Sequence, residues 1–338
     1  MEALVYDFLI NLPIILLFLV GAFSLFTLSK GADILVNQAV GLSIKWGVPK
    51  IIIGATIVSL GTTLPEASVS VLAALNGNPD LALGNSVGSI IANTALIIGI
   101  ASLIGKLPLD KNTINKQGRI QYLTGVLLVL VSLPFLSEGL GGNISQAVGI
   151  MFLVLLASYI YYSIKKAKET SMENISIKEV SENLDNRPIL IKFILMVSGM
   201  ALVIISSKVL IPTVEIGATR LGIPESIIAA TLVAFGTSLP ELITAITAVR
   251  KGHGELAIGN IIGADILNVL FVVGGAAAAT PGGLNVPTVF YKLQFPTMLV
   301  ALFAFRYFSK KGSDIDRKEG IFLLAIYIIY IVLNFTWL

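Results

Sequence analysis

Two glutamates, Glu66 and Glu241, stand inside otherwise apolar stretches of this 338-residue chain, and each ends a motif that reads GT(T/S)LPE. A charged side chain costs at least about 2.5–3.5 kcal/mol at the centre of a bilayer, so a carboxylate persists there when a cation or a proton neutralises it. On a helix, residues three and four positions earlier share the face of each glutamate. Those residues carry hydroxyl groups: Thr62, Thr63, Thr237 and Ser238. Because hydroxyl and carboxylate oxygens are ligands of hard cations such as Na⁺ and Ca²⁺, the pattern predicts a cation site.

A proline precedes each glutamate, at Pro65 and Pro240. Proline has no amide hydrogen and clashes with the carbonyl four residues back, which belongs to Gly61 or Gly236. Irregular backbone within a membrane is tolerated only beside protein or a cavity. We therefore expect two broken helices whose freed carbonyls add to the cation site.

A second pair of motifs, GNSVGSIIAN (84–93) and GNIIGADILN (259–268), follows the first pair. Ser89 and Asn93 are four residues apart and face one way on a helix, and Asn268 is the counterpart of Asn93. Asp265 either adds a third carboxylate or faces a water-filled vestibule. The four glycines of the two GxxxG patterns predict close helix packing: Gly84, Gly88, Gly259 and Gly263.

The composition places these motifs in a membrane protein. Of all residues 55% are hydrophobic and 13% are charged, which is too little polar surface for a water-soluble globule. Soluble enzymes and nucleic-acid-binding proteins are thereby disfavoured. The chain has no cysteine and a single histidine, His253, so thiolate metal sites are excluded and zinc sites built from histidines are disfavoured as well.

Apolar stretches of about 20 residues, long enough to cross a bilayer, alternate with short polar loops. The sequence predicts an all-α integral membrane protein with ten transmembrane helices in two halves, residues 1–164 and 189–338, around a polar loop at 165–188. The predicted spans are 8–29, 48–75, 81–104, 120–137, 146–164, 189–211, 223–249, 256–279, 289–308 and 320–338.

Positive charge predicts the orientation. Every Lys and Arg falls on the side that holds the 165–188 loop, except Lys208, Arg220 and Lys292. Cytoplasmic loops carry an excess of these residues. We therefore expect the loop in the cytoplasm and both termini outside it.

The two halves are repeats. Residues 47–66 and 222–241 match at 12 of 20 positions without a gap, and the same offset aligns 84–93 with 259–268. This repeat offset is the distance in sequence from Glu66 to Glu241. The copies, 47–99 and 222–274, lie five predicted crossings apart, so they enter the membrane from opposite faces. Such inverted repeats are typical of secondary transporters, which bind their substrates near the midplane.

The paired GTTLPE (61–66) and GTSLPE (236–241), each followed by GNxxGxxxxN, resemble the α-repeats of the sodium/calcium exchanger family, within the cation/calcium antiporter superfamily. Without a large regulatory domain, the chain looks like the compact prokaryotic type. The resemblance implies that Glu66 and Glu241 are central ligands shared by Ca²⁺ and Na⁺. It also implies side-chain ligands from the four hydroxyl residues named above and backbone carbonyl ligands from Ser59 and Ala234. The side chains that complete the sites would be Ser89, Asn93 and Asn268.

The chain departs from the family pattern at three positions. Ala264 stands where a serine is usual, which implies a weak or absent peripheral sodium site. Asn268 stands where some relatives have aspartate, and an asparagine there resembles the potassium-independent exchangers. Asp265 stands where relatives usually have asparagine, and it could replace the missing charge.

We therefore expect an antiporter of the cytoplasmic membrane that exchanges Ca²⁺ for Na⁺ by alternating access, with spans 1 and 6 moving across a fixed core. It is expected to need no cofactor and no obligate protein partner. One alternative keeps the fold and couples Ca²⁺ to H⁺ instead. A remote alternative is an intramembrane aspartyl protease that uses the aspartates of two GAD sequences, Asp33 and Asp265, although these do not follow the repeat offset. A duplicated scaffold without transport activity is a third alternative, and it predicts no ion flux.

Overall fold

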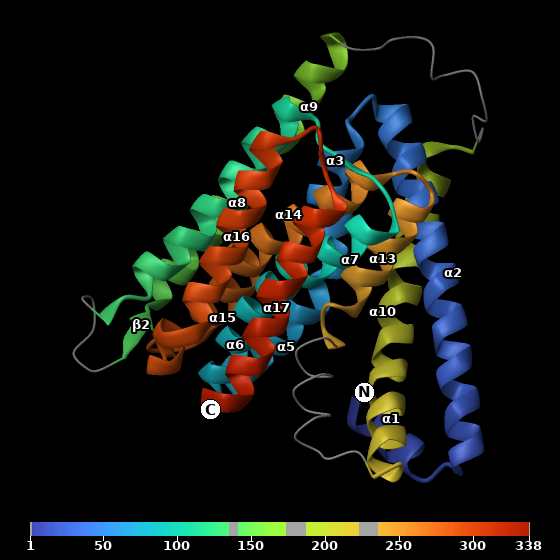
Figure 1. Ribbon diagram of the computed structural model, residues 1–338, viewed down its shortest axis with the longest axis vertical. Helices are drawn as coiled ribbons and strands as arrows, with labels where there is room; N and C mark the ends of the chain where they lie inside the picture. Colours follow the sequence, from blue (N-terminus) through green and yellow to red (C-terminus); the bar gives the residue numbers. More distant parts are fainter. Residues whose placement is uncertain (1, 135–140, 174–186, 223–235, 338) are drawn as a thin grey trace.

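A computed structural model describes residues 2–134, 141–173, 187–222 and 236–337. The described chain is mainly helical, as predicted (Figure 1). By length and composition five of its helical segments can cross a membrane, and a bent pair is a sixth: Ile14–Trp46, Pro79–Ile104, Gln146–Lys165, Ile189–Arg220, Gly254–Ala279, and the pair Lys50–Thr62 with Leu64–Leu75.

Two long helices, α2 (Ile14–Trp46) and α10 (Ile189–Arg220), pack along each other beside the other helices (Figure 1). Each is about 50 Å long at 1.5 Å per residue. Glycines bring the two backbones together: a Cβ on Gly31 would lie 2.9 Å from the Val203 nitrogen, and one on Gly199 would lie 2.8 Å from the Leu35 nitrogen.

The helix that carries most of the predicted first span, 8–29, begins and ends at other residues than that span. The short helix α1 (Glu2–Ile10) stops before Pro13, because proline begins a helix more readily than it continues one, and α2 starts at the next residue. That helix then runs on through Lys30 and Asp33 to Trp46.

The predicted helix break is present in the first half. The helical segment Lys50–Thr62 comprises α3 (Lys50–Ile53), the π-helix η1 (Gly54–Val58) and α4 (Ser59–Thr62), and it meets α5 (Leu64–Leu75) at an angle of 45°. Pro65 lies in the first turn of α5, where a missing N–H costs nothing. The matching helix of the second half, α13 (Leu239–Arg250), likewise has Pro240 in its first turn. Residues 223–235, which would precede this break, lie outside the described part of the chain.

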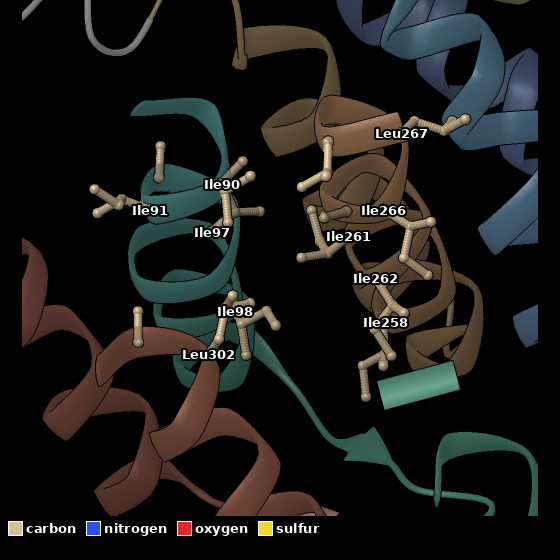
Figure 2. Close-up of a cluster of buried hydrophobic side chains, with 14 of the residues drawn as sticks. Ile90, Ile91, Ile97, Ile98, Ile258, Ile261, Ile262, Ile266, Leu267 and Leu302 are labelled. Carbon is tan, nitrogen blue, oxygen red and sulfur yellow. The ribbon is translucent and has the colours of Figure 1, made fainter. Parts of the chain in front are cut away.

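The centre of the molecule consists of two interrupted helices. One is α6 (Pro79–Ile91), η2 (Ala92–Ile97) and α7 (Ile98–Ile104), and the other is α14 (Gly254–Leu267), η6 (Asn268–Val273) and α15 (Gly274–Ala279). Isoleucines line both, among them Ile90, Ile97 and Ile261 (Figure 2). Almost every side chain of α14 is buried.

Close packing at the second GxxxG pair is confirmed. A Cβ on Gly259 would lie 2.2 Å from the Ile51 carbonyl oxygen, and one on Gly263 would lie 2.4 Å from that of Ala55. Helix α14 therefore lies backbone to backbone against α3 and η1. For the first pair, Gly88 has no described neighbour within 4 Å of such a Cβ and Gly84 has Phe290 at 3.9 Å. The residues that match Ile51 and Ala55 at the repeat offset, 226 and 230, lie outside the described part of the chain, so close packing of the first pair stays a prediction.

Further helices flank this centre: α8 (Lys111–Val131), α9 (Gln146–Glu173), η7 (Phe290–Gln294) with α16 (Phe295–Lys311), and α17 (Arg317–Trp337). Two small antiparallel sheets join loops, β1 (Leu107–Pro108) with β4 (Asp314–Ile315), and β2 (Gly142–Ile144) with β3 (Leu284–Val286). Both termini lie in the lower part of Figure 1, whereas α9 ends and α10 begins at the top.

The repeat offset recurs in the helix bounds. It separates the first residues of α5 and α13, and it separates their last residues as well. The same offset relates the first residues of α2 and α10 and those of α6 and α14.

Candidate cation site

The two sequence-predicted glutamates lie in corresponding places. Glu66 is in the first turn of α5 and Glu241 in the first turn of α13, where the positive end of the helix dipole favours an anion. Each residue is 1% exposed. Their side chains lie close enough for the two charges to interact. The pair therefore needs a positive charge if both carboxylates are ionised.

Hydroxyl groups from one half reach side chains of the other. Thr62 Oγ1 lies 3.4 Å from Asn260 Oδ1, and the Thr62 side chain also interacts with Glu241. Thr237 Oγ1 lies 3.5 Å from Ser89 Oγ. The GT(T/S)LPE motif of each half thus faces the GN motif of the other.

The helices that carry the predicted ligands pack in the same crossed manner. Helix α5, with Glu66, contacts η6, which begins at Asn268. Helix α13, with Glu241, contacts η2, which contains Asn93. The fold therefore brings the two pairs of motifs, which lie in opposite halves of the sequence, into one region.

Unpaired oxygen atoms concentrate in this region. Buried polar groups are normally hydrogen-bonded, because an unpaired one loses its interactions with water and gains none. Within the described residues, eight buried side-chain oxygens of α5, α13, α14 and the segments adjoining them have no protein partner: Thr63 Oγ1, Glu66 Oε2, Asn93 Oδ1, Ser238 Oγ, Glu241 Oε2, Thr244 Oγ1, Asp265 Oδ1 and Asn268 Oδ1. Such a set of oxygens suits a hard cation.

Carboxylates are a minority of this set. In the part of the chain that the structure describes, no group of three or more Asp, Glu, His or Cys residues is arranged to hold a metal ion. A cation bound between Glu66 and Glu241 would accordingly have these two carboxylates as ligands, together with neutral hydroxyl and amide oxygens.

Two predicted ligands are backbone carbonyls. The Ser59 carbonyl oxygen accepts hydrogen bonds from the Thr63 amide at 2.9 Å and from Thr62 Oγ1 at 3.3 Å, so it already has protein partners at the helix break. Ala234, its counterpart, lies outside the described residues.

Asp265 is 2% exposed, so it does not face a water-filled vestibule. Its Oδ2 atom accepts hydrogen bonds from Thr94 Oγ1 at 2.5 Å and Gln121 Nε2 at 2.7 Å. Asp265 also interacts electrostatically with Glu241, and the helices that carry them, α14 and α13, pack against each other.

Several buried polar residues near the site are not among the ligands predicted from the sequence. Gln121 and Thr94 hold Asp265, and Asn260 lies beside Thr62. Two features of the sequence could have indicated them: Gln121 is a polar residue at the start of the apolar stretch 120–137, and Asn260 is the second residue of a GN motif.

The two aspartates of the protease alternative have different partners. Asp33 lies on α2, where its carboxylate is 3.1 Å from Lys251 Nζ. Asp265 is held by Thr94 and Gln121 from η2 and α8. Aspartyl catalysis requires two carboxylates that share one site, and these side chains are engaged in separate interactions.

Comparison with known proteins defines the class of this chain. The model of the family described as sodium/calcium exchanger protein matches residues 16–165 and 191–336. The chain belongs to this family, as the motifs predicted. It is therefore a multi-pass membrane transporter of the cation/Ca²⁺ antiporter class and not an enzyme.

Individual relatives align over nearly their whole length. The inner membrane protein YrbG of Escherichia coli is 32% identical, over 91% of this chain and 93% of the relative. The sodium/calcium exchanger MaX1 of Methanosarcina acetivorans is 28% identical, over 94% and 98%. A solved structure of the sodium-calcium exchanger NCX_Mj, soaked with 10 mM Na⁺ and zero Ca²⁺, superposes with a TM-score of 0.80 at 27% identity, over 95% of this chain and 99% of that one.

Proposed function

We propose that this protein exchanges Ca²⁺ for Na⁺, and that the two ions compete for one site centred on Glu66 and Glu241. The observation that carries the proposal is the group of eight buried, unpaired oxygens around two glutamates whose charges interact. The names of MaX1 and NCX_Mj, which align over almost the whole chain, support the choice of these two ions.

Competition for one site produces exchange rather than leak. One Ca²⁺, or several Na⁺, neutralises the same carboxylates, so the two loads do not bind fully together. An empty site keeps two buried, mutually repelling charges, and this disfavours its reorientation. The protein accordingly switches the site from one side of the membrane to the other only when an ion load is bound.

The proposed ligand set keeps every residue that the sequence indicated. Its centre is the glutamate pair, with hydroxyl, amide and backbone oxygens around it: Thr62, Thr63, Thr237, Ser238, Ser89, Asn93, Asn268, Ser59 and Ala234. Asp265 is a third acidic member at the edge of the site.

The proposed architecture is ten transmembrane helices in two inverted repeats, 1–164 and 189–338. It is supported by the family model's two matches and by helix bounds that recur at the repeat offset. The Lys and Arg distribution favours a cytoplasmic 165–188 loop and termini outside. Alternating access would come from α2 and α10, whose hydrophobic stretches are mainly exposed on the outside of the described helices.

The test is ⁴⁵Ca²⁺ uptake into proteoliposomes with imposed Na⁺, K⁺ or H⁺ gradients. Uptake that requires an outward Na⁺ gradient at fixed pH is the expected result. The variants Glu66→Gln and Glu241→Gln should abolish uptake, whereas Asp80→Asn, which removes an exposed acid in the first turn of α6, should not. Uptake driven by a pH gradient alone would make the protein an H⁺-coupled antiporter.

A further inference from the structure

Asp265 belongs to a polar cluster that only one half of the chain possesses. The repeat offset relates Asp265 to Ile90, Thr94 to Val269 and Gln121 to Pro296. Each polar member thus has an apolar counterpart. The repeated motifs explain the glutamate pair, but they do not explain this cluster.

The three residues come from three different elements. Asp265 is on α14, Thr94 is in η2 and Gln121 is on α8, which lies outside both repeated motifs. Each of the three is at most 2% exposed. Because Thr94 and Gln121, which belong to different elements, both donate to the same atom, Oδ2, they fix the orientation of the carboxylate.

The other oxygen of this carboxylate, Oδ1, has no hydrogen-bond partner among the described residues. The Asn93 side chain interacts with Asp265, and Asn93 Oδ1 is likewise unpaired within the described chain. Two unpaired oxygens of adjacent side chains therefore lie beside the glutamate pair. An unpaired buried carboxylate oxygen needs a positive partner.

We propose that Gln121 and Thr94 are positioning residues that orient Asp265 so that its Oδ1 atom is a ligand of a monovalent cation in the site. This inference rests on the proposed Na⁺/Ca²⁺ exchange. Glu66 and Glu241 already balance the two charges of Ca²⁺. A third carboxylate therefore contributes most when the site holds several Na⁺, whose extra positive charge it balances. While Ca²⁺ is bound, the two neutral donors stabilise the remaining negative charge.

The variants are chosen to remove one donor each. Gln121→Met and Thr94→Val keep side-chain volume and remove the hydrogen bond to Asp265. Helix α8 offers matched controls: Gln117 is also buried but bonds Tyr159, and the Thr124 hydroxyl bonds the backbone of its own helix at Gln121. Gln117→Met and Thr124→Val are the corresponding control variants.

The measurement is ⁴⁵Ca²⁺ uptake in proteoliposomes at varied Na⁺ and Ca²⁺, which gives an apparent affinity for each ion. Gln121→Met and Thr94→Val should weaken the Na⁺ affinity by at least about tenfold and the Ca²⁺ affinity by less than about threefold. Asp265→Asn should act in the same direction. Adding Gln121→Met to Asp265→Asn should cause no further loss, because Gln121 acts through Asp265. Thr94→Ser, which keeps the hydroxyl, should retain the wild-type Na⁺ affinity.

Equal losses of Na⁺ and Ca²⁺ affinity, or equal effects of Gln121→Met and Gln117→Met, would show a merely structural role and overturn the inference. An unchanged Na⁺ affinity in Asp265→Asn would overturn it as well. A wild-type protein without Na⁺-dependent uptake would instead refute the proposed function, so the two failures are distinguishable.

Discussion

The Lys251 ammonium lies 3.1 Å from the Asp33 carboxylate and 3.1 Å from Asn37 Oδ1. Lys251 follows α13, whereas Asp33 and Asn37 are on α2, so the ion pair joins one of the two long outer helices to the site-bearing part of the chain. The repeat offset relates Asp33 to Lys208 and Lys251 to Asn76. No carboxylate stands at either matched position, so this ion pair has no equivalent in the other half.

Breaking this ion pair should change the rate of exchange more than the ion affinities. Its side chains are 31% and 39% exposed, and an exposed pair contributes at most about 1 kcal/mol. If α2 moves during transport, Asp33→Asn should alter the maximal rate by up to about fivefold. The exchanged pair Asp33→Lys with Lys251→Asp should recover the wild-type rate. Failure of this double variant to do better than either single one would contradict a role for the ion pair itself.

Substitution of either central glutamate by glutamine should remove the stabilisation of the protein by Ca²⁺. A ligand that binds the folded state raises its unfolding temperature as the ligand concentration rises above the dissociation constant. Loss of one buried carboxylate ligand should weaken Ca²⁺ binding at least about 100-fold. Thermal unfolding in detergent, with and without Ca²⁺, measures this. A Ca²⁺-dependent shift that persists in Glu66→Gln and in Glu241→Gln would contradict the assigned site.

Gly263→Ala should destabilise the protein. The added Cβ would lie 2.4 Å from the Ala55 carbonyl oxygen and 2.5 Å from Ser59 Oγ, so α14 would have to move away from η1 and α4. Overpacking of this kind costs about 1–3 kcal/mol. Gly275→Ala is the control, because its Cβ would meet only a Val71 methyl group at 3.5 Å. Equal unfolding temperatures for the two variants would contradict the close approach of these helices.

The stability of the protein should fall in mild acid through His253. Burial lowers the pKa of His253 below 6.5, and the nearby charges of Lys50 and Lys251 lower it further. The unfolded chain takes up this proton first, so the contribution is complete above about pH 6.5 and is lost as the pH falls toward the lowered pKa. His253→Gln should reduce the loss of thermal stability between about pH 7 and about pH 5. An identical pH profile in the variant would refute this assignment.

The sequence by itself determined the class of the protein and the centre of its proposed site. The family assignment followed from two short motifs at one offset, and the comparisons confirmed it. The helix break near Pro65 was also predictable, because a missing amide hydrogen and a ring clash act within a few residues. An acidic residue in an apolar stretch can be recognised from the local sequence alone, because the free-energy cost of placing its charge in a membrane does not depend on the rest of the fold.

Only the tertiary structure decided which side chains lie together. Nothing near Asp265 in the sequence indicates that Gln121 bonds it, and the extension of α2 past Asp33 brings that residue to Lys251. Close packing was predicted for the motif glycines, but only the structure shows which backbones Gly259 and Gly263 meet, those of Ile51 and Ala55. Local sequence governs where a helix starts, bends and ends, whereas contacts between distant segments depend on how whole helices pack, and packing joins residues that no local pattern relates.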